Sequence, residues 1–150
     1  MPVEISCKSE YALLALIELA VAYESGEPLQ IRQISAQQNI PDRYLEQLLA
    51  TLRRGGIVRS QRGAKGGYLL AREPWKITLF DVLACLEGFD NQPIDQERAL
   101  KSGKTLEGSI VCEIWQEANE AANSVFQKYT LKDLRERRDA RRQLDFMYYI

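Results

Sequence analysis

The sequence has no histidine and no long apolar run, and both absences exclude classes of protein. Without an imidazole, histidine-based catalytic triads and histidine metal sites are excluded. The lysine-containing glycine segment 63–67 also lacks the spacing of a phosphate-binding loop. An enzyme is therefore poorly supported by these residues.

Cysteine is scarce as well. The three cysteines, Cys7, Cys85 and Cys112, are odd in number and far apart, which does not suggest a secreted disulfide framework. No apolar run approaches the roughly 20 residues that span a membrane, and the first residues lack the charged-then-apolar pattern of a leader. We expect a cytoplasmic protein with reduced thiols and no membrane contact.

The most informative segment runs from residue 40 to residue 70. From Tyr44 onward, apolar residues recur at intervals of three and four, which predicts one buried helical face. Gly55 and Gly56 follow, and glycine ends helices because it adopts the left-handed conformation without a Cβ clash. A strand at 57–61, a turn at 62–67 and a second apolar run at 68–71 then predict a hairpin.

The residues upstream supply a second helix. Leu29, Ile31, Ile34 and Ala36 have the pattern of a short helix, residues 39–42 that of a tight turn, and Asp42 is the expected N-cap of the next helix. Two short helices joined in this way form a helix-turn-helix. The predicted fold is mainly α with a small β-hairpin wing, a winged helix-turn-helix followed by a long dimerisation helix.

Positive charge is concentrated in this part of the chain. Between residues 53 and 76 there are seven lysines or arginines and one acidic residue, Glu73, although the whole chain has a net charge of −1. A solvated basic face is the ordinary explanation of such a run. Next to a helix-turn-helix and a wing, it favours binding to duplex DNA.

Helices are predicted on both sides of this segment. The first, Lys8 to Tyr23, is apolar around most of its circumference and should pack against two surfaces. After the hairpin, Thr78 and Asp81 resemble a capping box that opens a helix ending near Gly88, with Cys85 expected in the core. Residues 89–108 lack periodicity and are expected to form a long loop.

A long helix is expected from Ser109 to Lys128. Its apolar seam includes small alanines that allow a second helix to approach closely, so we expect a homodimer. The alternative is that the seam packs only on its own domain. The predicted dimerisation residues are Ile110, Ile114, Ala118, Ala121, Ala122 and Val125.

The final segment begins with Thr130 as the expected N-cap of a last helix. Its four arginines, at positions 137, 138, 141 and 142, are candidates for DNA contact. A solvated helical end or a disordered tail is the favoured interpretation.

Several of these segments resemble a known family, the winged-helix regulators that include IscR, CymR and NsrR, called the Rrf-two family. The resemblance spans nearly the whole chain and implies a bacterial dimeric transcription factor. It divides the chain into a DNA-binding domain at 1–88, an effector or sensor loop at 89–108, and a dimerisation helix with a C-terminal helix or tail at 109–150, all one continuous unit. The specific segments are 9–20, 44–58 and 62–71, with weaker matches at 77–88 and 129–134.

The resemblance also implies which residues bind DNA. The second helix of the motif would enter the major groove, where Arg43, Tyr44 and Gln47 would reach bases or phosphates and Glu46 would accept from a cytosine amino group. Tyr44 also fits the apolar face and is alternatively a core residue. The wing would place Arg62 in the minor groove and hold phosphate with Lys65 and the amides near Gly66 and Gly67. Nonspecific attraction would come from Arg53, Arg54 and Arg59.

The resemblance says less about the signal that such a regulator would sense. Members with an iron–sulfur cluster carry three closely spaced cysteines before the long helix, and residues 89–108 contain none. Aligned on Trp115, Ser109 replaces the last of these cysteines and Cys112 replaces a histidine. A ligand set of Cys112 with Cys7 or Glu10 of the partner is one hypothesis; the alternative is that Cys112 is a small seam residue and Glu10 a surface acid.

Other signals and another function stay open at this stage. A small molecule or a protein is the expected effector in members without a cluster, and thiol oxidation at Cys7 or Cys112 is a third hypothesis. The alternative function is a protein-interaction adaptor that does not bind DNA. Salt dependence separates the two, because counterion release makes DNA affinity fall steeply with salt.

Overall fold

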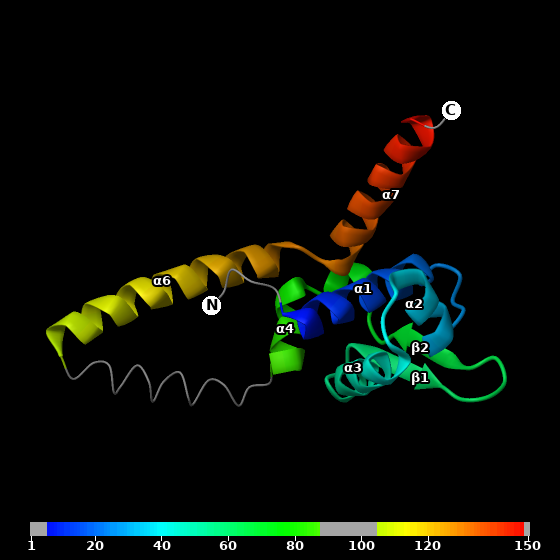
Figure 1. Cartoon of the computed structure of the whole chain (residues 1–150), viewed down its shortest axis with the longest axis horizontal. Coiled ribbons are helices and arrows are strands. Elements are labelled where there is room, and N and C mark those ends of the chain that lie inside the picture. The colour runs from blue at the N-terminus through cyan, green and yellow to red at the C-terminus, as the bar shows by residue number, and fades with distance from the viewer. Residues whose placement is uncertain (1–5, 88–104, 149–150) are drawn as a thin grey trace.

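The computed structural model describes residues 6–87 and 105–148, so most of the expected loop at 89–108 lies outside the described residues. The described chain is mainly helical with one two-stranded antiparallel hairpin. Figure 1 shows a compact group of short elements, a long helix α6 leading away from it and a final helix α7 projecting in another direction. The elements are α1 (Cys7–Val21), α2 (Ile31–Gln38), α3 (Asp42–Arg54), β1 (Val58–Gln61), β2 (Gly67–Leu70), the 3-10 turn η1 (Pro74–Lys76), α4 (Leu79–Glu87), α6 (Leu106–Lys128) and α7 (Leu131–Tyr148).

Helix α1 is the central element. Ser6 caps it, because the Ser6 hydroxyl accepts a hydrogen bond from the Ser9 amide at 3.1 Å. The helix contacts α2, α3, α4, α7 and β2, which confirms that its apolar circumference faces more than one surface. It ends at Val21, two residues before the expected end.

Helices α2 and α3 form the predicted helix-turn-helix. Gln30 and Gln33 cap α2 reciprocally, and Asn39 ends it in the left-handed conformation with a φ of 54°. The prediction that Asp42 is the N-cap of α3 was wrong: Pro41 holds that position and Asp42 is the first helical residue. The fixed backbone of proline suits the entry to a helix, and the Asp42 carboxylate in the first turn lies near the positive end of the helix dipole.

The end of α3 and the hairpin follow the expected plan. Gly55 is the C-cap of α3, and Gly56 takes the left-handed conformation with a φ of 76°. Strands β1 and β2 pair from Val58 with Leu70 at one end to Gln61 with Gly67 at the other. This hairpin, residues 58–70, is the wing.

A third segment completes the wing. The backbone of Leu29, just before α2, pairs with that of Tyr68: the Leu29 amide donates to the Tyr68 carbonyl at 3.0 Å, and the Tyr68 amide donates back at 2.7 Å. The wing is therefore attached to the segment that enters the helix-turn-helix.

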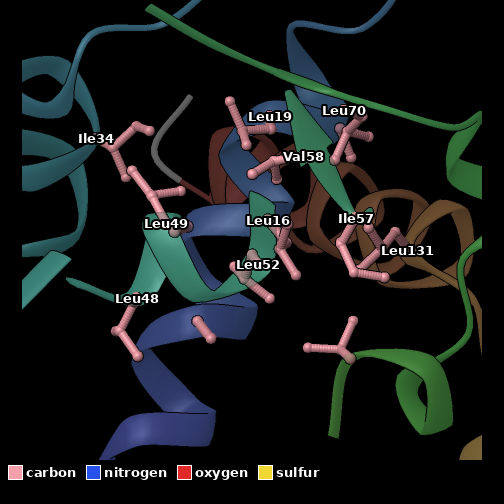
Figure 2. Close-up of a cluster of buried hydrophobic side chains, with 14 of the residues drawn as sticks. Leu16, Leu19, Ile34, Leu48, Leu49, Leu52, Ile57, Val58, Leu70 and Leu131 are labelled. Carbon is pink, nitrogen blue, oxygen red and sulfur yellow. The ribbon is translucent and has the colours of Figure 1, made fainter. Parts of the chain in front are cut away.

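The core joins all of these elements. Figure 2 shows side chains from α1, α2, α3, the hairpin and α7 converging on one cluster. Leu49 and Leu52 come from the buried face of α3, and Leu131 comes from the first residue of α7. The start of α7 thus belongs to the same core as the winged helix-turn-helix.

Threonines cap the three helices α4, α6 and α7. Thr78 and Asp81 form the predicted reciprocal cap of α4, with both hydrogen bonds at 3.1 Å, and Thr130 with Asp133 does the same for α7. The expected start of the long helix at Ser109 was wrong, because the helix begins at Leu106. Thr105 supplies the missed cap, since its hydroxyl accepts from the Gly108 amide at 3.0 Å and so draws Gly108 into the first turn.

Helix α7 continues to Tyr148, so the arginine-rich segment is helical within the described residues. Its arginines were candidates for DNA contact, but Figure 1 shows α7 leaving the molecule on the side opposite α3 and the hairpin. Arg138 is in fact paired with Glu18 of α1. None of the described helices has the length and apolar character needed to cross a membrane.

Candidate nucleic-acid interface

Helix α3 has one buried face and one polar face. The leucines at 45, 48, 49 and 52 are buried, which turns Arg43, Glu46 and Gln47 into solvent. Side chains of all three lie in the first half of the helix. The face therefore carries one cation, one carboxylate and one amide, a set that can both donate to and accept from base edges.

Tyr44 lies between these two faces. It is half-buried, packs against the core, and its ring meets that of Tyr11 edge-to-face with the centroids 5.5 Å apart. This contact fastens the start of α3 to α1. The core role of Tyr44 thus has structural support, and a DNA contact by its hydroxyl stays a prediction.

The end of α3 is linked to the wing through Arg53. The Arg53 guanidinium donates to the Ser60 hydroxyl at 3.3 Å, so a cation bridges the helix and β1. Arg54 donates to the Thr51 hydroxyl within the same helix, also at 3.3 Å. Together with exposed Arg59, these side chains place positive charge on the surface between helix and wing. Ser60 was not foreseen, because nothing in the sequence pairs it with α3.

The wing tip is shaped by glycines and carries exposed cations. Arg62 and Lys65 are both exposed. Gly66 is buried, and its amide donates to the Gly63 carbonyl at 2.9 Å, so that hydrogen is used inside the tip. Gly67 lies against the Leu29 backbone, where a Cβ would collide with the Leu29 carbonyl. The two glycines therefore shape the tip, and phosphate contact by Lys65 and by the Gly67 amide stays a prediction.

The surface of α6 is unusually apolar for a helix exposed to solvent. No residue of α6 is buried within the described single chain. Of the predicted seam, Ala122 is half-buried and the other five residues are exposed, including Ile114 at 60%. The prediction omitted three further exposed apolar side chains that the helical spacing would have included, namely Leu106, Val111 and Trp115.

The candidate sensor residues lie on two helices. Cys7 and Glu10 are exposed in the first turn of α1, and Cys112 is half-buried on α6. Among residues 6–87 and 105–148, no three histidine, cysteine, aspartate or glutamate side chains gather as a metal site. The ligand set across two subunits stays a prediction.

Cys85 has a structural environment, as expected. Its thiol donates to the Thr51 carbonyl at 3.5 Å, and the thiol also lies against Gly55 at the end of α3, where a Cβ would collide with the sulfur. Burial raises the pKa of the Cys85 thiol, opposed by a hydrogen bond from the Gly55 backbone and by the positive charges of Lys8 and Arg54. The thiol is therefore held in its neutral form behind α3.

The residues of one chain do not fit an iron–sulfur cluster. Clusters are held by several converging thiolates. Here Cys85 is occupied behind α3, Cys7 lies on another helix, and the sequence from 86 to 111 contains neither cysteine nor histidine. Only Cys112 remains on α6.

Comparison with known proteins gives a consistent result. A model of the family described as "Rrf2: Iron-dependent Transcriptional regulator" matches residues 5–137. The chain is 36% identical to the HTH-type transcriptional regulator CymR of Bacillus subtilis over 147 residues, which covers 98% of this chain and 99% of that protein. It is 30% identical over 132 residues to the regulator IscR of Cronobacter sakazakii, covering 87% of this chain and 78% of that one.

Solved structures show the same likeness. The structure of IscR from T. potens has a TM-score of 0.74 and 32% identity, covering 92% of this chain and 88% of that one. The structure of CymR, described as the global cysteine regulator of B. subtilis, has a TM-score of 0.69 and 33% identity, covering 89% and 97%.

Proposed function

Because this chain belongs to the Rrf2 family of transcriptional regulators, we propose that it binds specific sites in duplex DNA as a homodimer, with α3 and the wing as the contact surface. The observation that carries the proposal is the exposed polar face of α3 beside a wing whose tip carries Arg62 and Lys65. A helix of this kind fits the major groove, and a cationic hairpin fits the phosphates or the minor groove beside it.

The roles within this surface follow from position. Arg43, Glu46 and Gln47 would read base edges from the first half of α3. Arg53, Arg54 and Arg59 lie where helix and wing meet and would attract phosphates without regard to sequence. The bridge from Arg53 to Ser60 supports a fixed angle between the two contacting elements.

The proposal of a homodimer is supported by α6. At about 1.5 Å per residue, its 23 residues form a rod of about 35 Å. Its exposed apolar side chains form a surface that soluble monomers rarely leave uncovered, and small alanines in the seam allow close approach. A second copy of α6 supplies the complementary surface, and its two-fold symmetry matches paired DNA half-sites.

The test is selection from a random duplex library with the purified chain, followed by affinity measurements on the selected site across a salt series. We expect a recurrent two-fold sequence, sedimentation as a dimer, and an affinity that falls linearly with salt on logarithmic axes. An adaptor that binds only proteins would select no sequence and show no salt slope. A monomer with an ordered α6 would overturn the dimer.

A further inference from the structure

Three helices meet at a single carboxylate oxygen. Oε1 of Glu18, on α1, accepts a hydrogen bond from Nε2 of Gln38 at 2.6 Å and lies 3.8 Å from an Nη of Arg138. Gln38 is the last residue of α2, and Arg138 lies on α7. We call this set of residues, Gln38, Glu18 and Arg138, the three-helix contact.

The three-helix contact is shielded from water. Glu18 is only 8% exposed and is a charged side chain in the largely apolar buried set, and the Arg138 side chain is 18% exposed. Ion pairs gain strength as solvent is excluded, and removing one partner leaves the other charge uncompensated. The contact is therefore more than a surface ion pair, which contributes little.

A neighbouring arginine fastens the same two helices. Arg135 donates to the Ala20 carbonyl at 3.3 Å and pairs with Glu24 at 3.4 Å. Both acceptors lie at or just beyond the end of α1. Arg135 and Arg138, one turn apart on α7, therefore both attach α7 to this part of the chain.

The junction between α6 and α7 is also attached to the core, by two backbone hydrogen bonds. The Leu79 amide donates to the Tyr129 carbonyl and the Leu131 amide donates to the Ile77 carbonyl, each at 3.0 Å. Tyr129 and Leu131 are thus bonded to the first residue of α4 and to Ile77 just before that helix. The direction in which α6 leaves is fixed relative to the core.

We propose that Glu18 is a positioning residue that, through Gln38 and Arg138, sets the distance between the two recognition helices of the dimer and hence the spacing of the DNA half-sites. The inference rests on the proposed dimer. Gln38 precedes the turn into α3, so the three-helix contact connects α7, the helix that follows α6, to the start of the recognition helix α3. A dimer reads two half-sites about one helical turn apart, and one base pair corresponds to about 3.4 Å along the duplex.

Three variants and one control test the proposal. Glu18→Gln keeps the size of the side chain and an acceptor for Gln38 but removes the charge on α1 that pairs with Arg138. Among the described residues, Arg138 then keeps only its pair with Asp139 of its own helix, at 3.5 Å. Arg138→Gln removes the partner from α7, outside the helix-turn-helix, and Arg138→Lys keeps the charge. Arg142→Gln is the matched control, because Arg142 is exposed on the far half of the same helix.

The measurement is the affinity of each dimer for duplexes whose two selected half-sites differ in separation by single base pairs, with one half-site alone as reference. We expect the wild type to prefer one spacing by about tenfold, since paired binding is lost when the geometry forbids both contacts. Glu18→Gln and Arg138→Gln should reduce this preference to about threefold or less and leave the single half-site affinity within about twofold. Arg138→Lys should retain more of the preference, and Arg142→Gln all of it.

The outcomes separate this inference from the proposed function. A wild type that is monomeric, or that shows no salt-dependent affinity for duplex DNA, overturns the proposed function and this inference with it. A dimeric wild type whose spacing preference is absent, or survives in both Glu18→Gln and Arg138→Gln, overturns the inference alone. The inference alone is also overturned if these two variants lose as much affinity for a single half-site as for paired half-sites. If Glu18→Gln does not fold, Arg138→Gln decides.

Discussion

The backbone of Gly67 lies against the carbonyl group of Leu29, with no room between them for a side chain. Leu29 precedes the helix-turn-helix and Gly67 opens the second strand of the wing, so this contact sets the wing against the motif. The neighbouring hydrogen bonds between Leu29 and Tyr68 depend on the same close approach.

Gly67→Ala should therefore displace the wing. Forcing a methyl group into this contact should lower the free energy of unfolding by about 1–3 kcal/mol and weaken DNA binding. Chemical denaturation and a binding titration measure the two effects. Gly26→Ala is the control, because Gly26 also has a positive φ but has open space around its Cβ position, so only stability should change. Equal effects of both variants on DNA affinity would contradict the account of the wing.

Arg62→Ala tests the contact of the wing tip with DNA. A cation placed in the minor groove lies between the two phosphate backbones and displaces counterions, so removing it should weaken binding and reduce the slope of log affinity against log salt by about 0.9. Arg142→Ala, at an exposed position of α7, should leave the slope unchanged. If the wild-type slope persists in Arg62→Ala, this arginine does not contact the backbone.

Ile114→Glu tests the dimer surface of α6. A carboxylate at a position that is 60% exposed in the single chain should cost that chain little, but it should be strongly unfavourable in an apolar seam. We expect a monomer by sedimentation, with helix content retained, and a loss of about 100-fold or more in affinity for paired half-sites. Glu120→Gln, on the polar side of the same helix, should remain dimeric. A dimeric Ile114→Glu would place the interface elsewhere.

The raised pKa of Cys85 predicts its reactivity. Because the thiolate is the nucleophile, a raised pKa leaves less of it at a given pH, and the rate of alkylation should rise only as the solution becomes more alkaline. At pH 8, iodoacetamide should modify exposed Cys7 well before Cys85, and unfolding should remove the difference. Peptide mass mapping over time measures both rates. Equal rates in the folded protein would mean that the end of α3 is open around Cys85.

Local sequence signals located most of the fold. The leucine spacing predicted α3, the glycine pair its end, the Thr78–Asp81 cap the start of α4, and Thr130 the start of α7. The two helix starts that were predicted wrongly also depend on local caps. Pro41 caps α3 in place of Asp42, and Thr105 caps α6 in a segment without periodicity. Cap identity depends on backbone angles that neighbouring residues set jointly, so composition alone ranks the candidates poorly.

Contacts between distant segments were not predictable in the same way. Nothing in the sequence joins Glu18 to Arg138 or Leu29 to Tyr68, because each pair is brought together only by packing of the whole core. On α6 the helical spacing predicted an apolar seam, but the exposure of its side chains and of Trp115 follows only from the packing of the described residues. The residues proposed to bind DNA follow from the helix and turn pattern and from the resemblance, because no contact within one chain marks a surface for DNA.

The burial of Leu131 has a consequence for the order of folding during synthesis. Its side chain fills the core built by α1, α3 and the wing, although more than forty residues separate it from the end of α4. While the ribosome is still translating α6, the helix-turn-helix has an incomplete core with apolar surface open to other chains. Newly made protein should therefore depend on its last helix before it is protected from proteolysis and aggregation.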